Sequence, residues 1–222
     1  MRRWLFKVEP LGRTLSFYAP LALLEKALTY GRVLLLTWLL GAYEFGVWGL
    51  GMMVFAVLAP VATLGTNEAL GRYVSFYQAR GQLAPFLRRA AVVVLLMAAA
   101  SAALALLACG QVAALLATVS EAGRRLGGRE RLAVAALGVV NGVLMALYLN
   151  VQFCIRALRT YRLLAVVELA YTVGFTALAL AAGLVRPTGL NVLLAHAAVL
   201  GVMALVGGWA VHAYVRRYPG AG

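Results

Sequence analysis

The sequence predicts an all-α polytopic transmembrane helix bundle with six spans, and three observations carry this prediction. First, 64% of the 222 residues are hydrophobic and only 12% are charged, whereas soluble domains have about 45–50% apolar and about 25% charged residues. Second, the apolar residues fall into runs of about 20, the length of helix that crosses a hydrocarbon core of about 30 Å. Third, no strand pattern competes, and in lipid only helices and closed barrels satisfy the backbone.

Short polar connections separate the expected spans. Residues 1–18 form a basic, aromatic lead-in suited to the membrane interface. Residues 19–214 form the transmembrane part, and residues 215–222 form a tail. The connection 66–89 is expected to begin with a helical extension of the second span, and a second long connection covers residues 110–131. The spans are expected at about 20–41, 46–65, 88–109, 132–154, 163–183 and 190–212.

The charges set the expected orientation. The net charge is +13, and the basic residues lie mostly between the apolar runs, which favours a membrane face over nucleic acid as the partner of this charge. With the N-terminus inside, the inner segments hold 13 Lys and Arg residues and the outer segments hold 5. Because Lys and Arg accumulate on the cytoplasmic side, we expect both termini in the cytoplasm. The basic connection 110–131 is the exception to this rule.

The first span is apolar and yet carries charge. Glu25, Thr29 and Arg32 are spaced so that they share one helix face. Arg32 is expected near the bilayer midplane, where a charge costs about 2.5–3.5 kcal/mol on insertion scales. We therefore expect the bundle interior or a water-filled cavity to shelter it. Either Arg32 faces a cavity and attracts an anionic group, whose oxygens its planar fork would bind in pairs, or it pairs with Glu25 or Glu168 and ties helices together.

The other candidate site residues are less distinctive. Glu25 and Lys26 are close enough to the start of the first span to lie at the cytoplasmic interface instead of in a cavity. Arg72, at the inner end of the second span, either guards a cavity mouth or anchors the topology. Glu168, the one acid in spans two to six, is a counter-ion for Arg32 or a protonated hydrogen-bonding group.

The sequence contains no motif for covalent chemistry. It has no P-loop, no His-Glu-x-x-His and no Gly-x-Ser-x-Gly, so we expect no enzyme activity, no catalytic residue, no metal and no cofactor. Cys109 and Cys154 are isolated and are expected to act as small apolar residues. His196 is expected to make a hydrogen bond between helices. The small-residue step from Gly138 to Gly142 predicts close helix packing.

Three stretches together resemble the polysaccharide and oligosaccharide flippases. Residues 32–51 contain Leu40-Gly41-x-x-Glu44-Phe45-Gly46, which is similar to the first loop of that family, with Ala in place of the usual Pro after the first Gly. The Leu-Gly step and Arg-Tyr pair within residues 64–74 are similar to the end of the family's second helix. The basic turn 156–162 is similar to the turn between its fourth and fifth helices.

The resemblance implies a function that residue patterns alone do not give. A flippase of this superfamily usually has twelve to fourteen spans in two lobes around a central cavity, so this chain would cover the first lobe. It would lie in the inner cell membrane and move a lipid-linked sugar between leaflets by alternating access. Its partners would be that sugar lipid, membrane lipids, and a second lobe or a second copy. The rivals are a multidrug or ion-coupled exporter of the same superfamily and an incomplete or non-transporting membrane protein.

Overall fold

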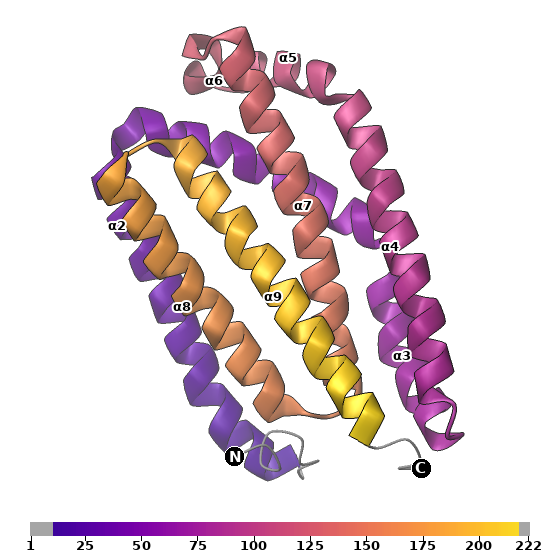
Figure 1. Ribbon diagram of the computed structural model, residues 1–222. Helices are drawn as coiled ribbons and strands as arrows, with labels where there is room; N and C mark the ends of the chain where they lie inside the picture. The colour runs from indigo at the N-terminus through magenta and orange to yellow at the C-terminus, as the bar shows by residue number, and fades with distance from the viewer. Residues whose placement is uncertain (1–10, 218–222) are drawn as a thin grey trace.

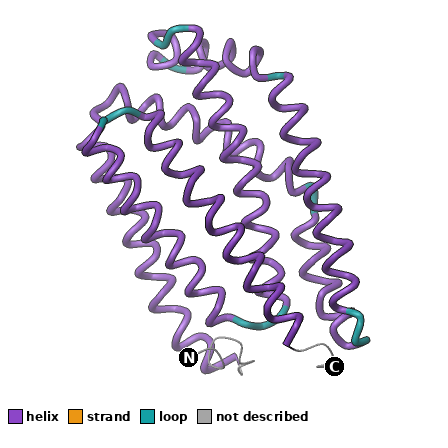
Figure 2. Tube along the Cα trace, in the orientation of Figure 1, coloured by secondary structure: helices purple, strands orange, loops and turns teal. Residues whose placement is uncertain are grey.

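The computed structural model describes residues 11–217, and this part of the chain is helical throughout, with short turns and no strand (Figure 2). Residues 1–10 of the expected lead-in and residues 218–222 of the expected tail lie outside the described residues. The helices are α2 (Leu11–Thr63), α3 (Thr66–Ala79), α4 (Leu83–Leu107), α5 (Cys109–Val119), α6 (Glu121–Arg125), α7 (Gly128–Ala157), α8 (Tyr161–Val185) and α9 (Gly189–Arg217).

The long helices have the surface of a membrane protein. Among the described residues, five helices are long and apolar enough to cross a bilayer: α2, α4, α7, α8 and α9. Large apolar side chains cover their outer faces, and Trp38, Leu107 and Val185 are each more than 80% exposed. Water-soluble proteins rarely expose continuous apolar surface of this kind. The chain is therefore a multi-pass membrane protein.

The first two expected spans are joined in a way that the sequence did not predict. We expected a short loop at residues 41–46, but only Gly41 leaves the helical conformation, with φ 70° and ψ 171°. We call residues 11–40 the first arm of α2 and residues 42–63 its second arm. The second arm turns away and passes obliquely behind α9 and α7 (Figure 1). The positive φ explains why a glycine stands at this bend, since other residues are strained there.

Glycines let the second arm approach α7 closely. A Cβ atom at Gly138 would lie 2.7 Å from the Cβ of Val54 and 2.9 Å from the carbonyl oxygen of Gly51. A Cβ atom at Gly142 would lie 2.9 Å from the Cβ of Leu58. Both approaches are closer than ordinary carbon contacts of about 3.5–4.0 Å. The packing role predicted for this small-residue step is confirmed.

The expected helical extension after the second span is present as α3. Leu64 and Gly65, with φ 41° and 77°, separate it from α2, and Gly81, with φ 67°, ends the following turn. The expected connection 110–131 is mostly helical too, because it contains α5 and α6. These two helices lie across one end of the bundle (Figure 1).

The interior is built from apolar side chains of α2, α7, α8 and α9, and Leu36, Val134, Ala135, Ala179 and Val192 are each no more than 1% exposed. The expected small apolar role of the two cysteines fits this packing, since both are free and buried. Burial also raises the pKa of the Cys109 thiol above its ordinary value, which keeps it neutral at physiological pH. The described ends of the chain, in α2 and α9, lie at the same end of the bundle (Figure 1).

Candidate functional site

Arg32 lies in the interior of the bundle, on the first arm of α2, and is only 8% exposed. Its Nη1 donates a hydrogen bond of 3.4 Å to Oγ1 of Thr176 on α8. Its guanidinium carbon lies 4.2 Å from the centre of the Phe175 ring, a distance at which a cation is attracted to an aromatic face. Its Nε is buried without a hydrogen-bond partner.

Among the residues that the structure describes, no carboxylate forms an ion pair with Arg32. Within the described part of the chain, the ion pairs join Lys26 to Glu25, Arg125 to Glu121 and Arg156 to Glu168. A buried charge without an ionic partner costs several kcal/mol of desolvation, and a long hydrogen bond to a hydroxyl recovers only part of that cost. The interior therefore holds a fixed cation whose binding capacity is incompletely used.

A hydrogen-bonded pair of side chains continues from Arg32 toward α9. The hydroxyl of Tyr171 and Nε2 of His196 share a hydrogen bond of 2.7 Å. The His196 ring also stacks on Phe175, with 4.3 Å between the ring centres. Phe175 thus lies in contact with both the guanidinium and the imidazole. The predicted role of His196, a hydrogen bond between helices, is confirmed, since Tyr171 lies on α8.

Asn141 of α7 adds a further buried polar group beside α9. Its Nδ2 donates to the carbonyl oxygens of Leu137 at 2.8 Å and Leu193 at 3.1 Å, and Leu193 lies one turn before His196. Its Oδ1, like Nδ1 of His196, is buried and has no hydrogen-bond partner. We call Arg32, Asn141, Tyr171, Thr176 and His196 the polar core. Buried polar atoms in proteins are nearly always paired, so the unpaired atoms on Arg32, Asn141 and His196 set the polar core apart from the apolar interior around it.

Glu168 belongs to a different cluster, nearer the start of α8. Its Oε1 accepts a hydrogen bond of 2.9 Å from Nη2 of Arg156, and its Oε2 accepts one of 2.7 Å from the hydroxyl of Tyr18. Nε2 of Gln152 lies 3.5 Å from Oε1. We call these four residues the Glu168 cluster. It joins α2, α7 and α8.

The pairing of Glu168 with Arg32, offered as one alternative by the sequence, is wrong. Arg32 contacts α8 at Phe175 and Thr176, seven and eight residues beyond Glu168. At 1.5 Å per residue, Glu168 therefore lies about 10–12 Å along α8 from the residues that contact Arg32. The second alternative, a pair with Glu25, is not formed either, because Glu25 pairs with Lys26 at 3.8 Å.

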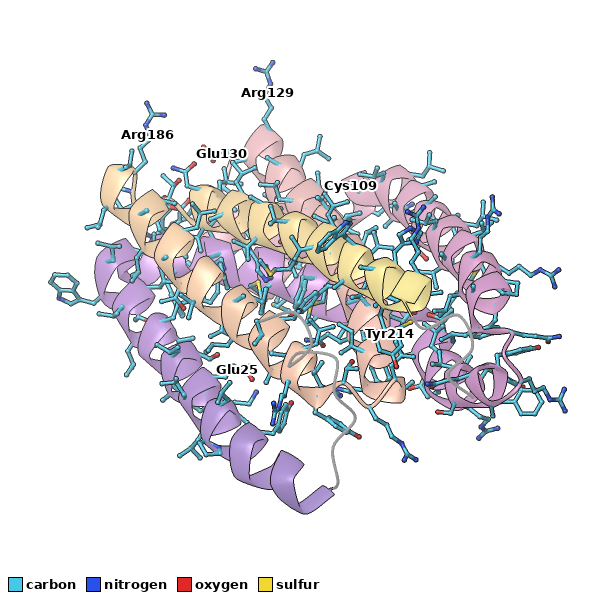
Figure 3. The ribbon with its side chains drawn as sticks, turned by 60° about the horizontal axis from the view of Figure 1, so that its bottom comes forward. Glu25, Cys109, Arg129, Glu130, Arg186 and Tyr214 are labelled. Atoms are coloured by element: carbon cyan, nitrogen blue, oxygen red, sulfur yellow. The ribbon has the colours of Figure 1, made fainter. Side chains whose placement is uncertain are left out.

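The remaining predicted site residues do not join the polar core. The side chain of Glu25 is 23% exposed and that of Lys26 is 67% exposed, and both lie on the first arm of α2, one to two turns before Arg32. Figure 3 shows Glu25 on this arm. Arg72 is exposed on α3. Of the five predicted residues, the structure brings together Glu25 and Lys26 alone as a direct pair.

Sequence reasoning missed Tyr171, Phe175 and Thr176. A signal for them exists in a span that is otherwise mostly aliphatic. Phe175 follows Tyr171 by one helical turn, and Thr176 follows Thr172 by one turn. Such spacing places the hydroxyls and aromatic rings on adjacent stripes of α8. Nothing in the sequence, however, ties that stripe to Arg32, which is 144 positions away from Thr176.

The segment from Leu40 to Gly46 has its own local roles. The Glu44 carboxylate accepts a hydrogen bond of 2.8 Å from the backbone N–H of Gly189, the first residue of α9. A carboxylate at a helix N-terminus is stabilising by about 0.3–1 kcal/mol. A Cβ atom at Gly189 would lie 2.6 Å from the carbonyl oxygen of Glu44. The segment therefore bends α2 and seats the start of α9 on the bend.

Charged side chains gather at the end of the bundle that carries α6. Arg129 and Arg186 project outward there (Figure 3). Ser120 caps α6 by accepting a hydrogen bond of 3.0 Å from the N–H of Gly123, and Glu121 pairs with Arg125. The Glu121 carboxylate partly offsets the basic charge of this connection, which departs from the expected orientation rule.

Metal binding is not indicated by the arrangement of side chains. Among the residues from Leu11 to Arg217 that are described, no three His, Cys, Asp or Glu side chains come together as a metal site would require.

The chain matches no protein-family model, no curated protein and no solved structure.

Proposed function

We propose that this chain is a transporter of the inner membrane that moves a lipid-linked oligosaccharide across the bilayer. The substrate would be a sugar joined to a polyprenyl pyrophosphate, carried from the cytoplasmic to the outer leaflet by alternating access. The observation that carries the proposal is the buried guanidinium of Arg32, which has an unpaired Nε and no carboxylate partner within the described part of the chain. Ionisable groups inside membrane spans are costly and mark substrate pathways by default.

The chemistry of Arg32 suits a pyrophosphate. Its planar guanidinium offers several N–H donors in a fixed fork, which binds phosphate oxygens in pairs. Phe175 fixes one face of that fork, and Thr176 accepts only one bond, at 3.4 Å. A bond of this length is weak, so an anion would replace it readily. When α2 and α8 separate, Arg32 would thus exchange its bond to Thr176 for bonds to the ligand.

The bend at Gly41 supports a six-pass arrangement with both termini on one side. We propose that the two arms of α2 cross the membrane separately, since 53 helical residues would extend about 80 Å against a hydrocarbon core of about 30 Å. With α4, α7, α8 and α9, this gives six crossings. The described ends of α2 and α9 lie together (Figure 1), and we place that end in the cytoplasm, following the Lys and Arg count.

We assign Glu168 to holding helices together rather than to ion coupling. Both of its carboxylate oxygens already accept hydrogen bonds, from Arg156 and from Tyr18. A coupling carboxylate must be free to exchange a proton or cation in each cycle, whereas both oxygens of Glu168 are engaged by other side chains. The flippase reading is therefore preferred over the ion-coupled exporter.

A flipping assay in proteoliposomes tests the proposal. The full chain is reconstituted, a fluorescent short-chain polyprenyl pyrophosphate sugar is added, and the fraction protected from an external quencher is followed over time. We expect Arg32→Ala to abolish flipping. Arg80→Ala is the matched control, because Arg80 also stacks on a phenylalanine, Phe76, at 4.1 Å but is exposed.

Two results would overturn the proposal. One is wild-type flipping by Arg32→Ala in vesicles that contain the protein at the same density, since Arg32 would then have no part in transport. The other is a rate for the wild-type chain equal to that of protein-free vesicles, which would show that this chain does not transport the substrate by itself.

A further inference from the structure

A groove opens between α4 and α9 on the side of the molecule away from the first arm of α2. The two helices meet near the end of the bundle where α4 begins and α9 ends, and there Leu83 and Tyr214 belong to one apolar cluster. They diverge from there, and α7 is visible between them (Figure 1). The groove has a volume of about 300 Å³. Its walls include Ala91 and Leu95 from α4, Asn150 and Cys154 from α7, and Leu205 and Gly208 from α9.

The lining of the groove suits a hydrocarbon chain, because it is almost entirely apolar. Asn150 contributes the one amide to its wall, and that amide has its partners inside the protein. Its Nδ2 donates to the carbonyl of Ala146 at 2.8 Å, and its Oδ1 lies 2.8 Å from the hydroxyl of Thr66, whose proton is shared with the carbonyl of Thr63 at 2.6 Å. The rims, Leu95 and Leu205, are 58% and 76% exposed. Because these helices belong to membrane spans, the opening faces lipid chains and not water.

Positive charge continues each rim toward the end of the bundle. Arg88 lies seven residues before Leu95 on α4, and Arg216 lies eleven residues after Leu205 on α9. These spacings are close to two and three turns, so each arginine lies on the same side of its helix as the rim residue. The distances along the axes are about 10 and about 16 Å. Both arginines are exposed, at the end where α4 begins and α9 ends (Figure 1).

We propose that this groove binds one acyl chain of an anionic phospholipid, with the lipid phosphate held by Arg88 and Arg216. A phospholipid fits both the apolar groove and the two arginines. Its acyl chain would contact the apolar wall, and its phosphate would bind the two guanidinium groups. A helix from a second copy of this chain would bury the same apolar wall but would leave the two arginines without an anionic partner. The lipid site is separate from the polar core, and neither Arg32 nor transport is needed for it.

Native mass spectrometry of the full chain tests this site. The protein is released from nanodiscs made of equal parts of phosphatidylglycerol and phosphatidylcholine, and the lipid that stays bound is counted. We expect one phosphatidylglycerol per wild-type chain. Gly208→Leu should reduce this occupancy about tenfold, the change expected when roughly two methylene groups of the chain are displaced.

The chain offers a matched control for Gly208→Leu. Gly201 lies on the same helix, and a Cβ atom at either glycine would meet no other atom within 4 Å; Gly201 does not line the groove. Gly201→Leu should therefore retain lipid as the wild type does. Ala91→Phe fills the groove from α4 and should lose lipid as Gly208→Leu does, which guards against misfolding of either variant.

A double variant separates the headgroup from the chain. Arg88→Gln with Arg216→Gln should keep a bound lipid but lose the preference for phosphatidylglycerol over phosphatidylcholine. The proposal is wrong if both groove-filling variants retain lipid normally, if Gly201→Leu loses it equally, or if the wild type binds the two lipids without preference. It is also wrong if the wild type is a dimer that Gly208→Leu converts to a monomer, since the groove would then be an interface between copies.

Discussion

The crossing of α2 over α7 can be tested at a single methyl group. In the substitution Gly138→Ala, the new Cβ would lie 2.7 Å from the Cβ of Val54 and 2.9 Å from the carbonyl oxygen of Gly51. Ordinary carbon contacts are about 3.5–4.0 Å, so the two helices must separate by about 1 Å. Overpacking of this kind costs about 1–3 kcal/mol, and the better helix propensity of alanine returns at most about 1 kcal/mol.

The expected result is a net loss of stability of about 1–2 kcal/mol. The free energy of unfolding would be measured in mixed micelles by titrating a denaturing detergent and following helical circular dichroism. Gly201→Ala is the control, because its Cβ would meet no atom within 4 Å and the substitution should be neutral or stabilising. Equal stability of the two variants would refute the helix crossing described for Gly138.

Two further changes test the contacts that seat α9 and α8. Glu44→Gln removes the carboxylate charge from the N-terminus of α9, where Gly189 donates to it at 2.8 Å, and should lower the unfolding free energy by about 0.3–1 kcal/mol; no change in micelle unfolding would show that this charge does not stabilise the helix. Glu168→Gln and Arg156→Gln, combined in a double-mutant cycle, should show a coupling energy of about 0.5–1 kcal/mol, because the Arg156 side chain is 44% exposed and its ion pair is partly screened. A coupling energy of zero would show that the Glu168–Arg156 pair does not hold α7 and α8 together.

The long helices could be predicted because each depends on a local signal. An apolar run of about 20 residues between polar or glycine-rich ends locates α4, α7, α8 and α9 without any knowledge of their neighbours. The bend of α2 was harder to predict from the sequence. The sequence shows Gly41 and Gly46 within six residues, which suggests a loop, but a single residue with positive φ is enough to redirect a helix.

The candidate site could be predicted only in part. Arg32 stands out because a charge in an apolar run is expensive, and its burial follows from that cost. The identity of its neighbours depends on the depth at which α8 packs against α2, which no local pattern records. The sequence therefore offered Glu168, the conspicuous charge of that span, whereas the structure brings Thr176 and Phe175 to the guanidinium.

The most direct test of the central claim is the affinity of the purified chain for a short-chain polyprenyl pyrophosphate, compared between the wild type and Arg32→Met. Methionine keeps an unbranched apolar side chain but removes the charge and all five donors. Since hydrogen bonds to charged groups contribute about 1.5–3 kcal/mol, the dissociation constant should rise about 10- to 150-fold, while the protein stays folded. Unchanged affinity in Arg32→Met would contradict the account, because the buried guanidinium would then bind no part of the ligand.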